Sequence, residues 1–425
     1  YSTTGRTLLG DVPAYQLFGI PADSFLSDPR AYYDFQTGHW FLSMFTVGTV
    51  SDGTLTSPST QYLAVSQTAN PFGPYTTFSW DTTDASNSAG GCPCFGDYDQ
   101  FGSNRYGIYI STNEFDIAGP DFNGTIIYAL SKTGLITAAQ GNGPAPTLET
   151  VRVPYGSDPY AAYHLAPSEV PQGQSEPATE YFVESNANTN YGDGLEVFAL
   201  LGTASLPNSS PSLAMSMTTV STEAYSTPPN ALQKSGPLPL GSSLGYGLRS
   251  LETDFDAVQE VTFAKGHLYA ELNSGFAYGT GTNSGADWFV LAPSTSGGGV
   301  SANLTKDGSV DTSQFILYPD IVVNSAGVGY MDFAVSGPTK YPSAAYVAFD
   351  GTSGATGPVH IAASGVNPLD DFTCYPPYGP ACRYGDYSGG QYYNGRIYMA
   401  TEYVAPQPRD TASNWATRLW GAPLP

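Results

Sequence analysis

The sequence predicts an all-β fold, a six-bladed β-propeller, and three observations support this prediction. Turn-forming and aromatic residues are abundant, with 48 Gly, 34 Pro, 31 Tyr and 21 Phe among 425 residues, which favours strands and turns over helices. Six segments share one pattern: an Asp, an apolar strand, a turn and a second strand, as expected for a hairpin. These segments recur at long, similar intervals, as the blades of a propeller do.

The leading aspartates of the six predicted hairpins define the repeat: they are Asp28, Asp97, Asp158, Asp256, Asp320 and Asp386. Their spacing is 61 to 69 residues, apart from 98 residues between the third and the fourth. Residues 202–250, rich in Ser, Pro and Gly, lie in that long interval and are predicted to be a surface insertion. We therefore expect a single domain over residues 1–425, with five or seven blades as the alternatives.

Each predicted hairpin is followed by a third strand, and these third strands begin near Gln61, Thr125, Leu195, Asp287, Ala344 and Asn414. Outer fourth strands are indicated by the segments PYTTFSWD, ETVRVPYG and PVHIAAS. The last repeat ends soon after its third strand. We expect the segment Val12–Phe18 to supply the missing strand and close the ring, because closure removes exposed sheet edges.

The four cysteines lie in loops rich in Pro, Gly and Tyr, and local pairing predicts the disulfides Cys374–Cys382 and Cys92–Cys94. A cross-link between the two loops and a four-cysteine zinc site are the alternatives, but the cysteine spacings differ from those usual for zinc. Two disulfides fit an oxidising compartment. Since the sequence also begins at Tyr1 without a methionine and has no apolar run of about 20 residues, we expect a mature, secreted extracellular protein.

The net charge of −23, from 37 acidic and 14 basic residues, argues against binding to nucleic acid or anionic lipid. We expect the partners to be cations, neutral glycans, extracellular proteins or further copies of the chain itself.

Several phrases resemble a family of secreted bacterial propeller proteins, among them SDPRAYYD, GDYDQFG, YPDIVVNSAGVGYMDFAVSGP and RYGDYSGG. The likeness runs from Asp28 to Trp420 and implies the fold and export; it supplies no catalytic residues. A looser resemblance, through Asp28-Pro29 and Gly38-His39-Trp40, is to propeller glycosidases. Sialidase-type Asp boxes are not found in the sequence.

The six leading aspartates are candidate metal ligands, because the first strands of propeller blades start at one rim of the central channel. Carboxylates brought together there would raise one another's pKa unless a cation intervened, and calcium prefers oxygen ligands. The cation site would comprise Asp28, Asp97, Asp158, Asp256, Asp320 and Asp386. The alternative is that each Asp caps its own turn through backbone N–H groups.

Glycosidase chemistry is the main catalytic alternative, and it requires two carboxyl groups in one site. The candidate catalytic residues are Asp28, Asp97, Asp320 and Asp386, with Asp99 on the same rim and Glu114, Glu271 or Glu402 on second strands. The four histidines are scattered and predicted to be structural, and no nucleophile elbow or phosphate-binding loop occurs.

The sequence thus favours a non-catalytic extracellular surface or matrix protein that binds a partner or self-assembles through a rigid propeller. A secreted glycoside hydrolase or lyase acting at the channel mouth is the alternative.

Overall fold

We describe a computed structural model of the chain, covering residues 10, 12–50, 53–84, 92–119, 121–153, 162–185, 191–406 and 412–425. The chain forms two compact units, each described by itself. The first unit comprises Tyr1–Glu169, Ser175–Glu184 and Phe198–Met217, and the second comprises Val170–Gln174, Ser185–Val197 and Thr218–Pro425. Antiparallel strands dominate both units, so the all-β prediction is confirmed.

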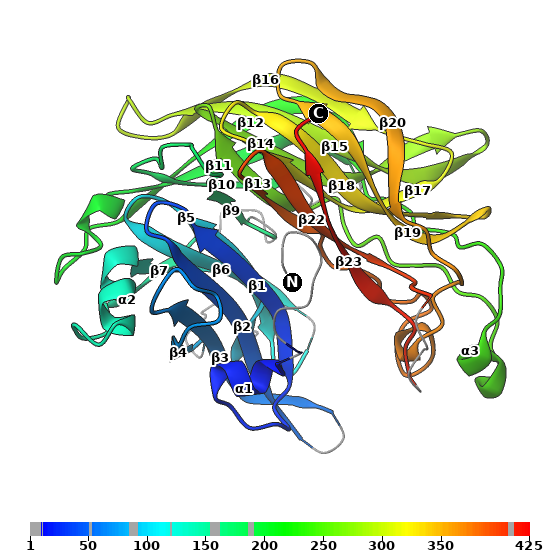
Figure 1. Ribbon diagram of the computed structural model, residues 1–425, viewed down its shortest axis with the longest axis horizontal. Coiled ribbons are helices and arrows are strands. Elements are labelled where there is room, and N and C mark those ends of the chain that lie inside the picture. The colour runs from blue at the N-terminus through cyan, green and yellow to red at the C-terminus, as the bar shows by residue number, and fades with distance from the viewer. Residues whose placement is uncertain are drawn as a thin grey trace. The chain divides into compact units, whose positions relative to one another are not determined.

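The first unit contains two four-stranded antiparallel meanders, in which consecutive strands are neighbours (Figure 1). One is β1 (Leu26–Asp34), β2 (His39–Thr49), β3 (Leu55–Ser66) and β4 (Tyr75–Asp81), and the other is β5 (Cys94–Ser103), β6 (Gly107–Asp116), β7 (Phe122–Ser131) and β8 (Leu148–Arg152). These strands confirm the first two predicted hairpins together with their third and fourth strands.

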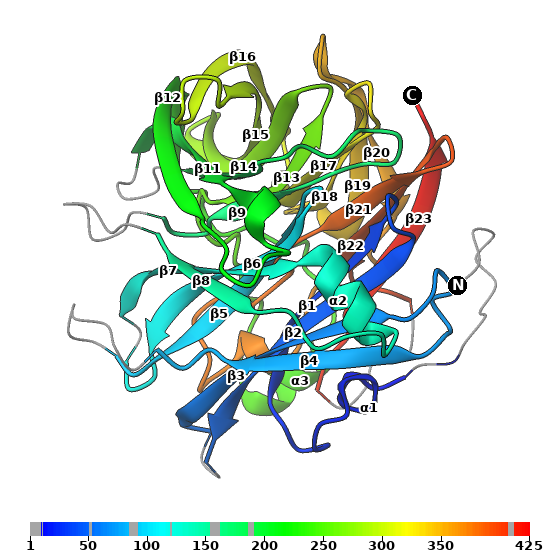
Figure 2. The same ribbon diagram turned by 90° about the vertical axis from the view of Figure 1, so that its left-hand side faces the viewer.

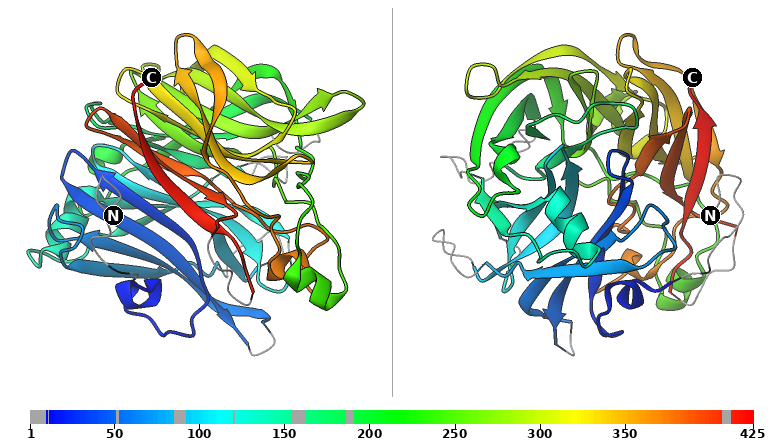
Figure 3. Two further views of the ribbon diagram at one scale, coloured as in Figure 1. Left: turned by 45° about the vertical axis from the view of Figure 1, so that its right-hand side comes forward. Right: turned by 60° about the vertical axis from the view of Figure 1, so that its left-hand side comes forward.

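Helix α1 (Ala14–Phe18) occupies the segment predicted to be the closing strand, so that prediction is wrong. Ala14, Leu17 and Phe18 have helical spacing and pack against β2 and β3, with Phe18 buried near Met44. Gly19 ends the helix in the left-handed conformation, at φ 71°. Figure 3 shows α1 beside the blue strands of the first meander.

Helix α2 (Lys132–Ala139) follows β7 and packs against β3, β4 and β6 as well as β7 (Figure 2). Its first residue, Lys132, is almost fully buried: the ammonium lies 2.9 Å from Asp34 Oδ2 and 2.5 Å from Glu176 Oε1. One buried cation thus holds two buried carboxylates, which come from the end of β1 and from the loop before strand β10 (Glu180–Ser185).

The third meander contributes residues to both units and has the strand order β12-β11-β10-β9. Its strands are β9 (Ala166–Glu169), β10 (Glu180–Ser185), β11 (Tyr191–Leu201) and β12 (Ala214–Ser226), with the short helix η1 (Thr203–Ser205) between the last two. Asp158 lies outside the described residues, and β9 starts later than the predicted strand. Strand β12 lies inside the predicted insertion, so residues 202–250 are only partly an excursion; the irregular remainder carries α3 (Pro239–Leu244).

The second unit contains three further meanders, which confirm the remaining predicted hairpins and third strands. They are β13 (Val258–Ala264), β14 (His267–Tyr278), β15 (Gly281–Ser294) and β16 (Ser301–Val310); β17 (Phe315–Val323), β18 (Val328–Gly337), β19 (Lys340–Asp350) and β20 (Gly354–Ala363); and β21 (Gly389–Tyr393), β22 (Arg396–Tyr403) and β23 (Ala416–Pro423). The short helix η2 (Phe372–Cys374) precedes the last meander, which has three strands within the described residues. Antiparallel meanders of four strands are the units of β-propellers, whereas the number of blades stays a prediction.

Buried side chains fill both units along the inner strands. In the first unit Phe41, Leu63 and Ile110 belong to one core cluster, and in the second unit Ile321, Met331 and Phe349 belong to another. All nine residues of β17 are buried, whereas those of the outer strand β16 are exposed or half-buried. Polar side chains on inner strands therefore lie in dry surroundings, where their pKa values shift.

Both predicted disulfides are present, Cys92–Cys94 and Cys374–Cys382. The second one closes a loop between β20 and β21.

Candidate active site

The first strands of four meanders carry a β-bulge. The pairing register shifts between Ser27 and Arg30, Asp97 and Gln100, Val258 and Val261, and Leu317 and Asp320. Within three of these bulges a residue other than glycine has a positive φ: Asp28 at 52°, Tyr98 at 53° and Tyr318 at 50°. Bulges redirect side chains, and such backbone conformations are uncommon and often found at functional sites. Residues at these bulges are therefore candidates for a functional site.

In the first unit, Asp28 and Arg30 of β1 bond to the bulge of β5. The Tyr98 N–H donates to Asp28 Oδ2 at 3.0 Å, and Arg30 Nε donates to the Asp99 carbonyl at 2.9 Å. The Tyr98 ring stacks on the buried His164 with centroids 4.1 Å apart. The strands that carry the candidate catalytic residues Asp28 and Asp97, β1 and β5, are thus joined by hydrogen bonds.

Buried carboxyl groups lie close to this connection. Asp99 is fully buried; its Oδ2 accepts hydrogen bonds from Ser43 Oγ at 2.9 Å and Gln61 Nε2 at 2.8 Å. Burial raises the pKa of Asp99 to about 7, an effect increased by the nearby Asp28 charge. Burial likewise raises the pKa of Glu114, which lies on β6 beside Asp97, to about 8. Neither Asp99 nor Glu114 is exposed to solvent. These two carboxyl groups are therefore poorly placed to meet a substrate.

In the second unit, two of the candidate residues, Asp386 and Glu402, lie in a more open setting. One terminal nitrogen of Arg383 donates to both carboxylate oxygens of Asp386, at 3.2 and 3.0 Å. The Gly385 N–H donates to Glu402 Oε2 at 2.9 Å, and the Tyr384 hydroxyl donates to the Glu402 carbonyl at 2.9 Å. The loop before β21 thus fixes both carboxyl groups.

A second segment, distant in sequence, adds Glu252 and Asp254. It is held beside the disulfide loop because Leu251 forms a parallel β-bridge with Cys382 and the Glu252 N–H donates to the Cys382 carbonyl at 2.9 Å. We call the side chains of Glu252, Asp254, Arg383, Asp386 and Glu402 the acidic cluster.

The environment separates the pKa values within the acidic cluster. Burial raises the pKa of Glu402 to about 8, opposed by the Gly385 hydrogen bond and reinforced by neighbouring carboxylates. Burial, followed by the charge of Asp386, raises the pKa of Asp254 to about 7. The pKa of Arg383 is raised chiefly by the Asp386 carboxylate. At neutral pH the cluster therefore offers a protonated carboxylic acid, Glu402, near the carboxyl group of Asp386, to which Arg383 donates.

Part of the acidic cluster is accessible, unlike Asp99 and Glu114. The Arg383 side chain is 61% exposed and that of Asp386 is 30% exposed, while Glu252, Asp254 and Glu402 are half-buried. Carboxyl groups whose pKa values are raised by burial, next to an accessible ion pair, make this cluster a candidate functional site.

Three further candidate residues, Asp256, Asp320 and Glu271, lie on or next to strands outside the acidic cluster. Burial raises the pKa of Asp256 to about 6, and Thr227 Oγ1 donates to its Oδ1 at 3.4 Å. Asp320 is buried on β17 opposite Asp332 of β18. The Glu271 carboxylate accepts backbone N–H groups from Glu260 at 3.1 Å and Ile321 at 3.2 Å, and so links β13 to β17.

Among the residues that the structure describes, no group of three or more His, Cys, Asp or Glu side chains is arranged to hold a metal ion. The calcium site of the six leading aspartates stays a prediction, since Asp158 lies outside those residues.

Sequence reasoning named Asp386 and Glu402 but missed Glu252, Asp254 and Arg383. The Arg383-to-Asp386 spacing of three was a usable signal for an ion pair. The sequence gives no comparable signal for Glu252 and Asp254, because they lie in an irregular segment whose position depends on the β-bridge between Leu251 and Cys382.

The fold and the cluster together define an all-β protein of blade-like meanders with an accessible acidic site. No protein-family model and no curated protein matches the chain. Among solved structures, the GH43 endo-arabinanase from Bacillus licheniformis is 11% identical, with 79% of this chain and 99% of that chain covered and a TM-score of 0.30. The endo-1,5-alpha-L-arabinanase from Thermotoga petrophila RKU-1 is also 11% identical, with 96% and 85% covered and a TM-score of 0.23. At this level of similarity the activity of the arabinanases does not transfer to this chain.

Within the described ranges, no helix is long and apolar enough to cross a membrane.

Proposed function

We propose that the chain is a secreted glycoside hydrolase that uses Glu402 as the general acid and Asp386 as the general base. The observation that supports this proposal is the pairing of a carboxyl group whose pKa is about 8, that of Glu402, with a carboxylate that an arginine holds. Two carboxyl groups in different protonation states are what hydrolysis of a glycosidic bond requires.

In the proposed reaction, protonated Glu402 donates its proton to the glycosidic oxygen as the bond from that oxygen to the anomeric carbon breaks. Water attacks the anomeric carbon and transfers a proton to the Asp386 carboxylate. The Gly385 N–H, already bonded to Glu402 Oε2, stabilises the negative charge that Glu402 gains.

Arg383 orients the Asp386 carboxyl group and weakens it as a base and as a nucleophile alike. Its guanidinium donates to both oxygens of Asp386, which draws electron density from each of them. A general base at Asp386 gives inversion of the anomeric configuration, which proton NMR of the first product formed will report. Retention would assign Asp386 the nucleophilic role instead.

The test is hydrolysis of a panel of neutral polysaccharides by the wild type and by Glu402→Gln and Asp386→Asn variants. Each substitution should lower kcat by about 100-fold or more, since each removes one proton-transfer group. Asp311→Asn, at an exposed carboxyl group outside the acidic cluster, serves as the matched control and should keep full activity.

The pH profile gives a second measurement. Because Glu402 must be protonated to act, activity should decline as the pH rises through about 8. The proposal fails if the wild type hydrolyses no polysaccharide on the panel, or if Glu402→Gln retains wild-type activity. In that event the non-catalytic interpretation, a surface or matrix protein, would take its place.

A further inference from the structure

Three exposed aromatic rings lie on and beside the disulfide loop. Tyr246 is 37% exposed, Phe372 is 46% exposed and Tyr378 is 47% exposed. Phe372 and Tyr378 meet edge to face with centroids 5.3 Å apart, and Tyr246 stacks on the buried Tyr375 at 5.4 Å. We call Tyr246, Phe372 and Tyr378 the aromatic patch. Exposed rings gathered in this way usually mark a binding surface.

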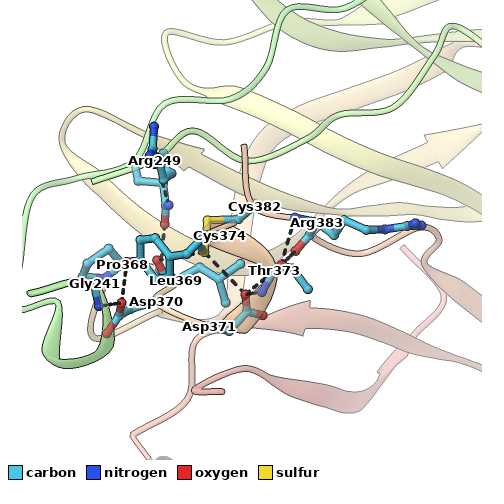
Figure 4. The surroundings of a disulfide bond; sticks show 12 residues. Gly241, Arg249, Pro368, Leu369, Asp370, Asp371, Thr373, Cys374, Cys382 and Arg383 are labelled. Atoms are coloured by element: carbon cyan, nitrogen blue, oxygen red, sulfur yellow. Dashed lines mark hydrogen bonds between the residues drawn. A yellow bond between two sulfur atoms is a disulfide. The ribbon is translucent and has the colours of Figure 1, made fainter. Parts of the chain in front are cut away.

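The loop that carries the patch is held rigidly. The Tyr375 hydroxyl donates to Asp370 Oδ1 at 2.6 Å, and the Leu240 and Gly241 N–H groups both donate to the same carboxylate at 2.9 Å. Figure 4 shows Asp370 and Gly241 on one side of the Cys374–Cys382 disulfide, with Thr373 and Arg383 on the other. A ligand that binds here therefore meets rings that are already ordered, which lowers the entropic cost of binding.

The residues that follow Phe372 and Tyr378 in the sequence contact residues of the acidic cluster at two places. The Arg383 N–H donates to the hydroxyl of Thr373, the residue after Phe372, at 3.1 Å. Gly379, the residue after Tyr378, lies close to Glu252: a Cβ at this glycine would stand 3.6 Å from Glu252 Oε1. A chain-like ligand on the patch would thus come next to Arg383 and Glu252 of the acidic cluster.

We propose that the aromatic patch binds a neutral polysaccharide, with successive sugar rings on Phe372 and Tyr378, and so forms the substrate-binding surface of the proposed hydrolase. Aromatic rings offer apolar faces to the C–H faces of sugars, and the tyrosine hydroxyl can bond to sugar hydroxyls. The carboxylates of the acidic cluster and the net charge of −23 oppose acidic polysaccharides. This inference rests on the proposed function for its substrate class, but its test does not require hydrolysis.

The experiment is affinity electrophoresis of the Glu402→Gln variant in gels containing soluble xylan, arabinan or β-glucan, with polygalacturonate as the acidic comparison. The Glu402→Gln background prevents hydrolysis during the run. We expect at least one neutral polysaccharide to retard the protein and polygalacturonate not to do so. Adding Phe372→Ala and Tyr378→Ala should weaken the retarding interaction by about 10-fold or more.

The matched control in the same background combines Phe72→Ala and Tyr278→Ala, which remove two other rings that are each 50% exposed, in the β3–β4 and β14–β15 hairpins. This control should bind as the Glu402→Gln variant does. Circular dichroism and the melting temperature establish that every variant is folded.

The possible outcomes separate the two proposals. Loss of binding only in the Phe372/Tyr378 variant supports the patch, even if the wild type hydrolyses nothing, in which case only the proposed function fails. Binding that survives removal of both rings, or no binding to any neutral polysaccharide, overturns the patch, even if hydrolysis is observed. Sedimentation of the wild type as a dimer that the Phe372/Tyr378 substitutions dissociate would also overturn it, because a second copy would then cover the rings.

Discussion

The substitution Asp99→Asn should flatten the dependence of stability on pH. Asp99 is fully buried, and its pKa rises from 3.8 to about 7 on folding. The folded protein therefore keeps the Asp99 proton at pH values where the unfolded chain has released it. Where the folded state binds more protons, the free energy of unfolding falls as the pH rises. Asp99 should thus lower the stability of the wild type progressively from about pH 4 to about pH 7.

The magnitude follows from the pKa shift. Each pH unit between the unfolded and the folded pKa costs about 1.4 kcal/mol, so raising the pH from 5 to 8 should remove about 2–3 kcal/mol through Asp99 alone. In Asp99→Asn, the new amide oxygen can still accept the hydrogen bonds from Ser43 and Gln61, and no charge develops. The variant should therefore be less stable than the wild type at pH 5, or equal to it, and gain about 2–3 kcal/mol relative to the wild type by pH 8.

The assay is urea unfolding followed by fluorescence at pH 5, 6, 7 and 8, for both proteins in the same buffers. Other buried acids, such as Glu114, titrate in both proteins and cancel in the difference. Parallel curves for the wild type and Asp99→Asn would refute the reasoning, since Asp99 would then have the same pKa in the folded and unfolded states.

Three further predictions concern groups described above. Lys132→Met should cost about 3–5 kcal/mol in urea unfolding, because it leaves two buried carboxylates without their cation, and a cost below about 1 kcal/mol would contradict this. Gly385→Ala should lower both the melting temperature and kcat, since Gly385 has φ +81° and an added Cβ would stand 2.4 Å from the Tyr318 ring; unchanged values would show that the loop has room. Replacing Cys374 and Cys382 together by serine should cost about 2–3 kcal/mol, because the cross-link closes a short loop, and calorimetry should find a stability equal to that of the wild type only if the bond is absent in solution.

The repeat could be predicted because its signal is local. Alternating apolar residues and glycine turns located the hairpins after Asp28, Asp97, Asp256 and Asp386, and the pairing of nearby cysteines followed from their positions in loops. The segment Val12–Phe18 was misassigned because its apolar residues are few enough to suit either a helix or a strand.

Only part of the acidic cluster could be predicted from the sequence, because its members come from segments far apart in the chain. Asp386 and Glu402 belong to one predicted hairpin, so the repeat brought them together. Asp254 joins them through the Leu251 bridge, a contact across more than a hundred residues that no local pattern encodes. Its raised pKa, like that of Glu402, arises from burial, which becomes known only once the chain has folded.

The third meander determines where the chain can be divided. Strand β11 gives its first residues to the second unit and its last ones, from Phe198, to the first unit, and β12 is likewise divided after Met217. No cut at a single position would therefore separate one complete unit from the other. The boundary between the two units thus runs through the third meander. Recombination between relatives should accordingly preserve folding best when its breakpoints fall between meanders.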